Sequence, residues 1–155
     1  MQVRIHLYAV PRSFQTVTKD ERDEFKAFLA SAIDEQLNIN PYNNAVSKFL
    51  PFDGRVKVAI HWCINTINTE RTLDELNWGD IDNVAKPLMD SLQGKVIKND
   101  RQVIELSLLK HSLKDFSLSE RPVEKMTYAT YSGSRAVSLG TDFVFIEVCD
   151  ATFHV

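Results

Sequence analysis

The apolar residues of the first forty positions change their spacing, and this change restricts the fold more than any other feature of the chain. Over residues 2–10, apolar and polar side chains alternate, as in a strand with one buried face. Thr18 and Glu21 then form a capping-box pattern, and apolar residues recur at helical spacing (Phe25, Phe28, Leu29, Ala32, Ile33 and Leu37). The sequence therefore predicts a strand, a helix over residues 19–37 and a loop over 38–54.

The order of strand and helix is repeated in the middle of the chain. Alternation predicts a strand over 56–64, and an unbroken helical stripe follows a polar connection over 65–79 (Ile81, Val84, Ala85, Leu88, Met89 and Leu92). Gly94 ends this helix, and further strands are expected over 95–98, 103–109 and 143–149. Residues 115–141 are expected to be irregular, with a hairpin near Gly133. The pattern predicts an α+β fold, with two amphipathic helices packed on one mixed β-sheet.

The length and composition are those of one globular domain. The chain has 155 residues, of which 44% are hydrophobic and 25% charged, so we expect a single domain over residues 1–155. No apolar run is long enough to cross a bilayer and the N-terminus lacks a signal-peptide pattern, which predicts a soluble, cytoplasmic protein. Cys63 and Cys149 lie in strand-like runs and are expected to be reduced core residues rather than zinc ligands.

The net charge of −3 argues against a protein that coats nucleic acid without selectivity. The charge is unevenly placed, however. Many acids lie in the first predicted helix (Asp20, Glu21, Asp23, Glu24, Asp34 and Glu35), whereas basic residues are scattered over the C-terminal half (Lys95, Lys98, Arg101, Lys110, Lys114, Arg121, Lys125 and Arg135). The total charge therefore understates the capacity of the chain to hold DNA.

The most informative segment is 79–101, which reads GDIDNVAKPLMDSLQGKVIKNDR. Asp82, Lys86 and Asp90 follow one another at four-residue intervals on the polar face of the second helix. Pro87 lacks a backbone N–H and clashes with the carbonyl four residues earlier, which predicts that a regular helix begins only near Asn83 or bends there. Asp80 and Asp82 would then lie in an extended entry segment, with both carboxylates on the same side.

Two converging carboxylates repel each other unless a cation compensates. Ligation by oxygen alone favours Mg²⁺ or Mn²⁺ over zinc, and such an ion suits phosphodiester hydrolysis because it activates a water and neutralises developing charge. Lys86, one turn from Asp82, is placed to stabilise the same charge. Asp100 follows the helix closely enough in sequence for us to expect it at the same end of the sheet.

The same residues are also consistent with purely structural roles. Asp82 and Asn83 are common at helix N-termini, Asp82 and Lys86 can form an exposed salt bridge, and Asp100 is a typical turn residue. A calcium-binding EF-hand does not fit, because Val84 and Ala85 stand where that loop needs a ligand and a glycine.

The segment resembles the signature of RusA-type Holliday junction resolvases. That signature reads D-x-D-N-x-x-K, then D-x-L, then an acidic pair before a strand, and it corresponds here to Asp80, Asp82, Asn83, Lys86, Asp90, Leu92 and Asp100. The resemblance implies a homodimeric endonuclease that introduces paired, Mg²⁺-dependent nicks into four-way DNA junctions. By position, Asp80, Asp82 and Asp100 would bind the metal and Lys86 would be the catalytic lysine. A two-fold dimer would place one site on each of two opposed strands.

The chain departs from the family pattern at three places. Asn99 replaces the first acid of the closing pair, and residues 10–14 lack the asparagine of the Pro-Pro-Ser-x-Asn element that many members carry after the first strand. The segment before Asp80, often basic in relatives, here contains Glu70, Asp74 and Glu75. A less selective Mg²⁺-dependent nuclease and a noncatalytic DNA-binding protein with this fold therefore remain as alternatives.

The other polar residues admit two interpretations each. Asp90 is interpreted as a supporting or structural acid, and the four histidines are assigned to packing or to the surface (His6, His61, His111 and His154). Several basic and aromatic residues are candidates for phosphate contacts or for a DNA-facing loop, and equally for a solvated surface (Arg12, Arg121, Lys125, Arg135, Tyr128 and Tyr131).

Overall fold

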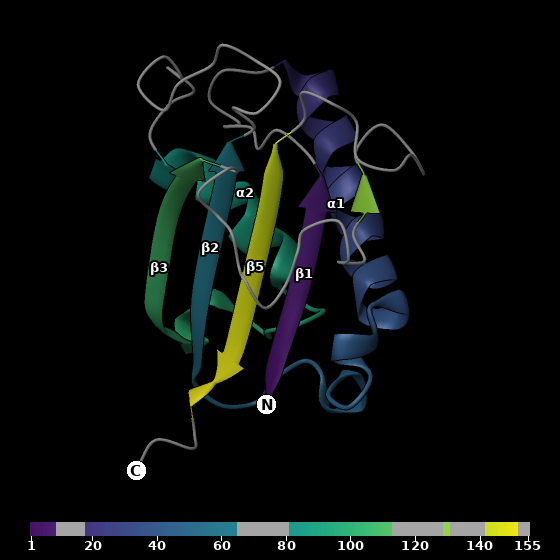
Figure 1. Ribbon diagram of the computed structural model, residues 1–155, viewed down its shortest axis with the longest axis vertical. Coiled ribbons are helices and arrows are strands. Elements are labelled where there is room, and N and C mark those ends of the chain that lie inside the picture. Colours follow the sequence, from purple (N-terminus) through teal and green to yellow (C-terminus); the bar gives the residue numbers. More distant parts are fainter. Residues whose placement is uncertain (9–17, 65–80, 113–128, 131–141, 152–155) are drawn as a thin grey trace.

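The computed structural model describes residues 1–8, 18–64, 81–112, 129–130 and 142–151 (Figure 1). The elements in chain order are β1 (Gln2–Tyr8), α1 (Lys19–Ile39), η1 (Pro41–Asn43), η2 (Ser47–Phe49), β2 (Val56–Ile64), α2 (Ile81–Leu92), η3 (Asp100–Gln102), β3 (Val103–Ser112), β4 (Ala129–Thr130) and β5 (Phe143–Asp150).

One mixed sheet organises the fold, with the strand order β3-β2-β5-β1-β4. The last strand in sequence, β5, lies in the middle and runs antiparallel to both β1 and β2. Strands β2 and β3 are parallel, as are β1 and the two-residue β4. The α+β fold with a mixed sheet and two helices is therefore confirmed, whereas the order of the strands is not contained in the sequence pattern.

Both helices pack on one face of the sheet and form the core with it (Figure 1). The core combines buried residues of α1 and α2 with the inward faces of the long strands (among them Phe25, Leu29, Leu88, Ile5, Ile60, Trp62 and Ile146). Thr18 caps α1 by accepting a 3.2 Å hydrogen bond from the backbone N–H of Glu21, as predicted. Among the described helices, none is long and apolar enough to span a membrane.

The sheet is buried on both faces near its centre, which differs from the half-buried first strand that alternation predicted. Arg4 and His6 of β1 are only 8% and 5% exposed. The ring of His6 stacks on Phe145 of β5 at 5.0 Å between centroids, and the Arg4 guanidinium lies 3.8 Å from the centre of the Tyr42 ring. The polar side chains of β1 are therefore buried against aromatic rings.

The side chains of Gln36, Asn40 and Asn43 form hydrogen bonds with the part of β1 that does not pair with β4. The Asn43 side chain accepts a hydrogen bond from the Arg4 N–H at 2.8 Å and donates to the Arg4 carbonyl at 2.7 Å. Gln36 accepts from the His6 N–H at 3.0 Å, and Asn40 donates to the Gln36 amide oxygen at 3.2 Å. Asn43 thus contacts β1 much as a neighbouring strand would, and it shields a sheet edge that would otherwise be open to other strands.

Replacing Asn43 with alanine is expected to lower the free energy of unfolding by about 3 kcal/mol, because buried backbone groups of Arg4 and Gln36 lose their partner. The measurement is urea unfolding followed by circular dichroism. Asn44→Ala serves as the control because Asn44 is exposed. Equal midpoints for the two variants would contradict the role assigned to Asn43.

Helix α2 begins earlier than predicted and continues through Pro87. The proline removes the hydrogen bond to the carbonyl of Asn83, and its side chain is buried. Burial of this face, which includes Ala85 and Leu88, compensates for the missing bond. The expectation that Asp82 lies in an extended segment was therefore wrong: Asp82 belongs to the first turn of the helix.

The helix ends as predicted, but the segment after it is not a strand. Gly94 has a φ of 83°, a conformation that favours glycine, and the N–H groups of Val96 and Ile97 both bond to the carbonyl of Leu92. Residues 95–98 form a turn with only isolated bridges at Ile97. The predicted hairpin near Gly133 and the connection over 65–79 lie outside the described residues, and β4 is the described part of the stretch over 115–141.

The two cysteines are free, as predicted. Cys63 is buried, and burial raises the pKa of its thiol well above the usual range. Burial and the nearby Glu147 carboxylate raise the pKa of Cys149 as well. Both thiols are therefore held in their protonated form at neutral pH and are poor nucleophiles.

Candidate active site

The first half of the candidate site lies at the beginning of α2. Asp82 is the second residue of the helix, and Lys86 follows one turn later with its side chain exposed. Asp90, two turns from Asp82, is exposed near the other end of the helix. Asp80 and the side chain of Asp82 lie outside the described residues. The backbone of α2 thus places Lys86 on the turn next to Asp82, at the spacing that the proposed charge stabilisation requires.

The second half of the site lies in η3, the short turn before β3. Asp100 is the first residue of η3, and its side chain is exposed. Asn99 caps this turn by accepting a 2.9 Å hydrogen bond from the Arg101 N–H. Among the described residues, no hydrogen bond or ion pair involves the Asp100 carboxylate. Its oxygens are therefore available for an external ligand.

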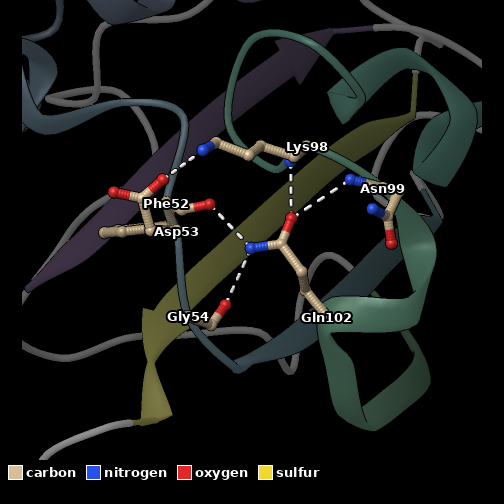
Figure 2. Close-up of polar contacts among 6 residues, drawn as sticks. All are labelled: Phe52, Asp53, Gly54, Lys98, Asn99 and Gln102. Carbon is tan, nitrogen blue, oxygen red and sulfur yellow. Dashed lines mark hydrogen bonds and ion pairs between the residues drawn. The ribbon is translucent and has the colours of Figure 1, made fainter.

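The side chain of Gln102 connects η3 to the segment before β2 through hydrogen bonds (Figure 2). Its amide oxygen accepts hydrogen bonds from the N–H groups of Lys98 and Asn99, and its amide nitrogen donates to the carbonyls of Phe52 and Gly54. Lys98 also forms an ion pair with Asp53. Gln102 is not among the residues predicted from the sequence, although Asn99 and Gln102 have the three-residue spacing of a capping box.

Within one chain, the two halves of the site lie at opposite ends of α2. The helix has twelve residues, so its ends are roughly 16 Å apart at a rise of about 1.5 Å per residue. Its C-terminal end contacts the segment that leads to η3, because the Ile97 N–H bonds to the carbonyl of Leu92 and the Phe52 N–H to that of Val96. Carboxylates that share one Mg²⁺ each lie only ~2 Å from the ion. A single chain therefore does not bring Asp82 and Asp100 together.

This separation differs from the prediction that Asp100 lies at the same end of the sheet as the start of the helix. Strands β2 and β3 are parallel, and α2 connects them (Figure 1). A crossover between parallel strands must carry the chain back along the sheet before the next strand begins. Asp100, directly before β3, consequently lies at the end where β2 also begins.

The remaining candidates are distributed as follows. His6 and His61 pack near the Phe145 ring, which supports the assignment of these two histidines to packing. Lys95 forms an ion pair with Asp34 at 2.6 Å, and the Lys110 ammonium lies 5.0 Å from the centre of the Trp62 ring. The other candidate phosphate-binding residues lie outside the described part of the chain (Arg12, Arg121, Lys125, Arg135, Tyr128 and Tyr131). Within that part, no group of three His, Cys, Asp or Glu side chains could hold a metal ion.

Comparison with known proteins identifies the class of enzyme. A family model described as endodeoxyribonuclease RusA matches residues 4–117, which span most of the chain and all of the candidate site. The chain is thus an endodeoxyribonuclease, a hydrolase that acts on DNA phosphodiester bonds. It belongs to the RusA family, whose members act on branched DNA junctions and generally depend on a divalent metal. No curated protein matches the chain.

Proposed function

We propose that the protein is a Mg²⁺-dependent endonuclease that resolves four-way DNA junctions by paired nicks. The observation that carries this proposal is the family match over a segment in which the acids and the lysine occur together at the required spacing. Noncatalytic DNA binding is less favoured, because several acids facing phosphate would only weaken binding. We also propose that residues 1–155 form one nuclease domain, since β5 lies between β1 and β2 although it follows the matched region.

Asp80, Asp82 and Asp100 are the proposed metal-binding residues. The donor set consists of carboxylates, and hard oxygen donors fit Mg²⁺ or Mn²⁺. The exposed Asp100 carboxylate, which has no partner among the described residues, also fits this role. A bound divalent cation would activate a water and neutralise the charge that develops on the phosphate. The Lys86 ammonium would stabilise that charge from the adjacent turn of α2.

The separation of the two halves supports a site shared between two copies of the chain. Asp82 and Asp100 are too far apart to bind one ion within a single protomer, because they lie at opposite ends of α2. In a two-fold dimer, the start of α2 in one protomer can lie against η3 of its partner, and symmetry then creates two identical sites. Two such sites suit a substrate in which two opposed strands are cut.

A nuclease with less selectivity for junctions is the second candidate. Glu70, Asp74 and Glu75 precede the first acid of the constellation, where relatives often carry basic residues. Negative charge beside the DNA weakens the phosphate contacts that hold a large branched substrate. This departure affects substrate selection, whereas the residues proposed to bind the metal are unchanged.

A labelled synthetic four-way junction and a linear duplex of matched sequence distinguish these candidates. With Mg²⁺, we expect symmetric nicks in the junction and little cleavage of the duplex. EDTA should abolish cleavage of either substrate, because the carboxylates alone cannot activate water. Equal cleavage of the two substrates would overturn junction resolution while leaving the nuclease intact. Binding without any Mg²⁺-dependent cleavage would overturn the enzymatic proposal itself.

A further inference from the structure

We propose that Gln102 is a positioning residue, which holds Asp100 in the orientation needed for metal binding. This inference rests on the proposed function, since it assigns a role to Gln102 through the metal site. Gln102 lies two residues after Asp100, in the same turn η3, and its side chain points toward the segment over 52–54 (Figure 2). It does not contact the metal or the DNA in this proposal.

The side chain of Gln102 uses its full hydrogen-bonding capacity. Its oxygen accepts two hydrogen bonds, from the Lys98 N–H at 2.6 Å and the Asn99 N–H at 3.1 Å. Its nitrogen donates two, to the Phe52 carbonyl at 2.6 Å and the Gly54 carbonyl at 2.8 Å. An amide has two acceptor lone pairs and two N–H donors, so all four positions are occupied.

The segment to which Gln102 attaches is firmly held in the fold. Phe52 is 3% exposed within the core, and its N–H donates a 2.8 Å hydrogen bond to the carbonyl of Val96. The backbone around Asp100 is therefore connected on both sides to buried structure. In contrast, the ion pair between Lys98, just before the turn, and Asp53 joins side chains that are 56% and 84% exposed. Exposed ion pairs contribute little to the position of a loop.

Only an amide of this length satisfies all four groups at once. Glutamate in place of Gln102 would still accept from the two N–H groups, but its second oxygen would face the carbonyls of Phe52 and Gly54. Methionine, of similar length and without charge, would satisfy none of the four. Either change should release the turn from the segment over 52–54 and leave the Asp100 carboxylate without a defined direction.

The test is Mn²⁺ binding by the full chain without DNA, measured from the electron paramagnetic resonance signal of free Mn²⁺. We expect Gln102→Met and Gln102→Glu to raise the dissociation constant for Mn²⁺ about 10- to 100-fold, the usual effect of removing a residue that orients a ligand. Because glutamate adds a negative charge, a purely electrostatic effect would instead strengthen Mn²⁺ binding in Gln102→Glu. Weaker Mn²⁺ binding in both variants would therefore indicate that Gln102 acts by positioning Asp100 and not through its charge.

Two control variants separate positioning from other effects. Gln93→Glu makes the same chemical change at an exposed glutamine near the end of α2 and should keep the wild-type affinity. Leu29→Ala removes a buried side chain of α1 and lowers stability away from η3, so it reports the effect of destabilisation alone. Circular dichroism and size-exclusion chromatography establish that each variant is folded and has the wild-type oligomeric state.

The possible outcomes are distinct. If wild-type protein binds Mn²⁺ and a folded Gln102→Met variant binds it equally well, the role of Gln102 is overturned and the proposed function stands. An equal loss of affinity in Leu29→Ala would also overturn it, because destabilisation would then account for the effect. If wild-type protein neither binds Mn²⁺ nor cleaves DNA, the proposed function fails and the inference fails with it.

Discussion

Replacing Asp82 with asparagine is expected to abolish Mg²⁺-dependent nicking of a four-way junction while leaving junction binding intact. The substitution removes a negatively charged oxygen from the proposed metal site, and the loss of several kcal/mol of charge stabilisation corresponds to about a 10³-fold lower rate. Binding should persist or tighten, because a charge that repels phosphate is absent. Single-turnover cleavage measures the first effect, and an electrophoretic mobility shift in EDTA measures the second.

Asp90→Asn is the matched control for this experiment. It makes the same change of charge in the same helix, at an exposed residue two turns from Asp82. We expect it to retain most of the nicking activity, because Asp90 is interpreted as a supporting or structural acid and not as a metal ligand. Wild-type nicking by Asp82→Asn would contradict the proposed metal site, whereas an equal loss in Asp90→Asn would extend that site along the helix.

A heterodimer of Asp82→Asn and Asp100→Asn protomers is expected to nick DNA although neither homodimer does. In a shared site, one active centre of this heterodimer contains both replaced residues and the other contains both native ones. One intact site per dimer should produce about half of the wild-type nicking rate, with cuts in one strand only. Co-expression with two different affinity tags and tandem purification isolates the heterodimer for the cleavage assay.

The reciprocal heterodimer is the control. It pairs a wild-type protomer with one that carries both substitutions, so each shared site lacks one of its acids and cleavage should be lost. If each site were instead formed by one chain, this second heterodimer would be the active one and the first would be inactive. A protein that remains monomeric at the concentrations of the assay would exclude the shared site.

The sequence by itself was sufficient to predict most of the local elements and to select the residues of the proposed site. The change of apolar spacing predicted β1, α1, β2 and α2 within a few residues, because strand and helix periodicity record which face is buried. Thr18 and Gly94 marked helix ends through local hydrogen bonding and backbone conformation. The carboxylates and Lys86 were visible because their spacing is a local property of α2 and the segments beside it.

Only the tertiary structure decided how these parts are placed relative to one another. The central position of β5, the burial of Arg4 and His6, and the attachment of η3 by Gln102 all depend on contacts between residues far apart in the chain. The same holds for the proposed acids. Asp82 and Asp100 are close in sequence, yet a helix between parallel strands separates them by its own length. Sequence spacing therefore selected the residues proposed to bind the metal, and the direction of α2 separates Asp82 from Asp100 within one chain.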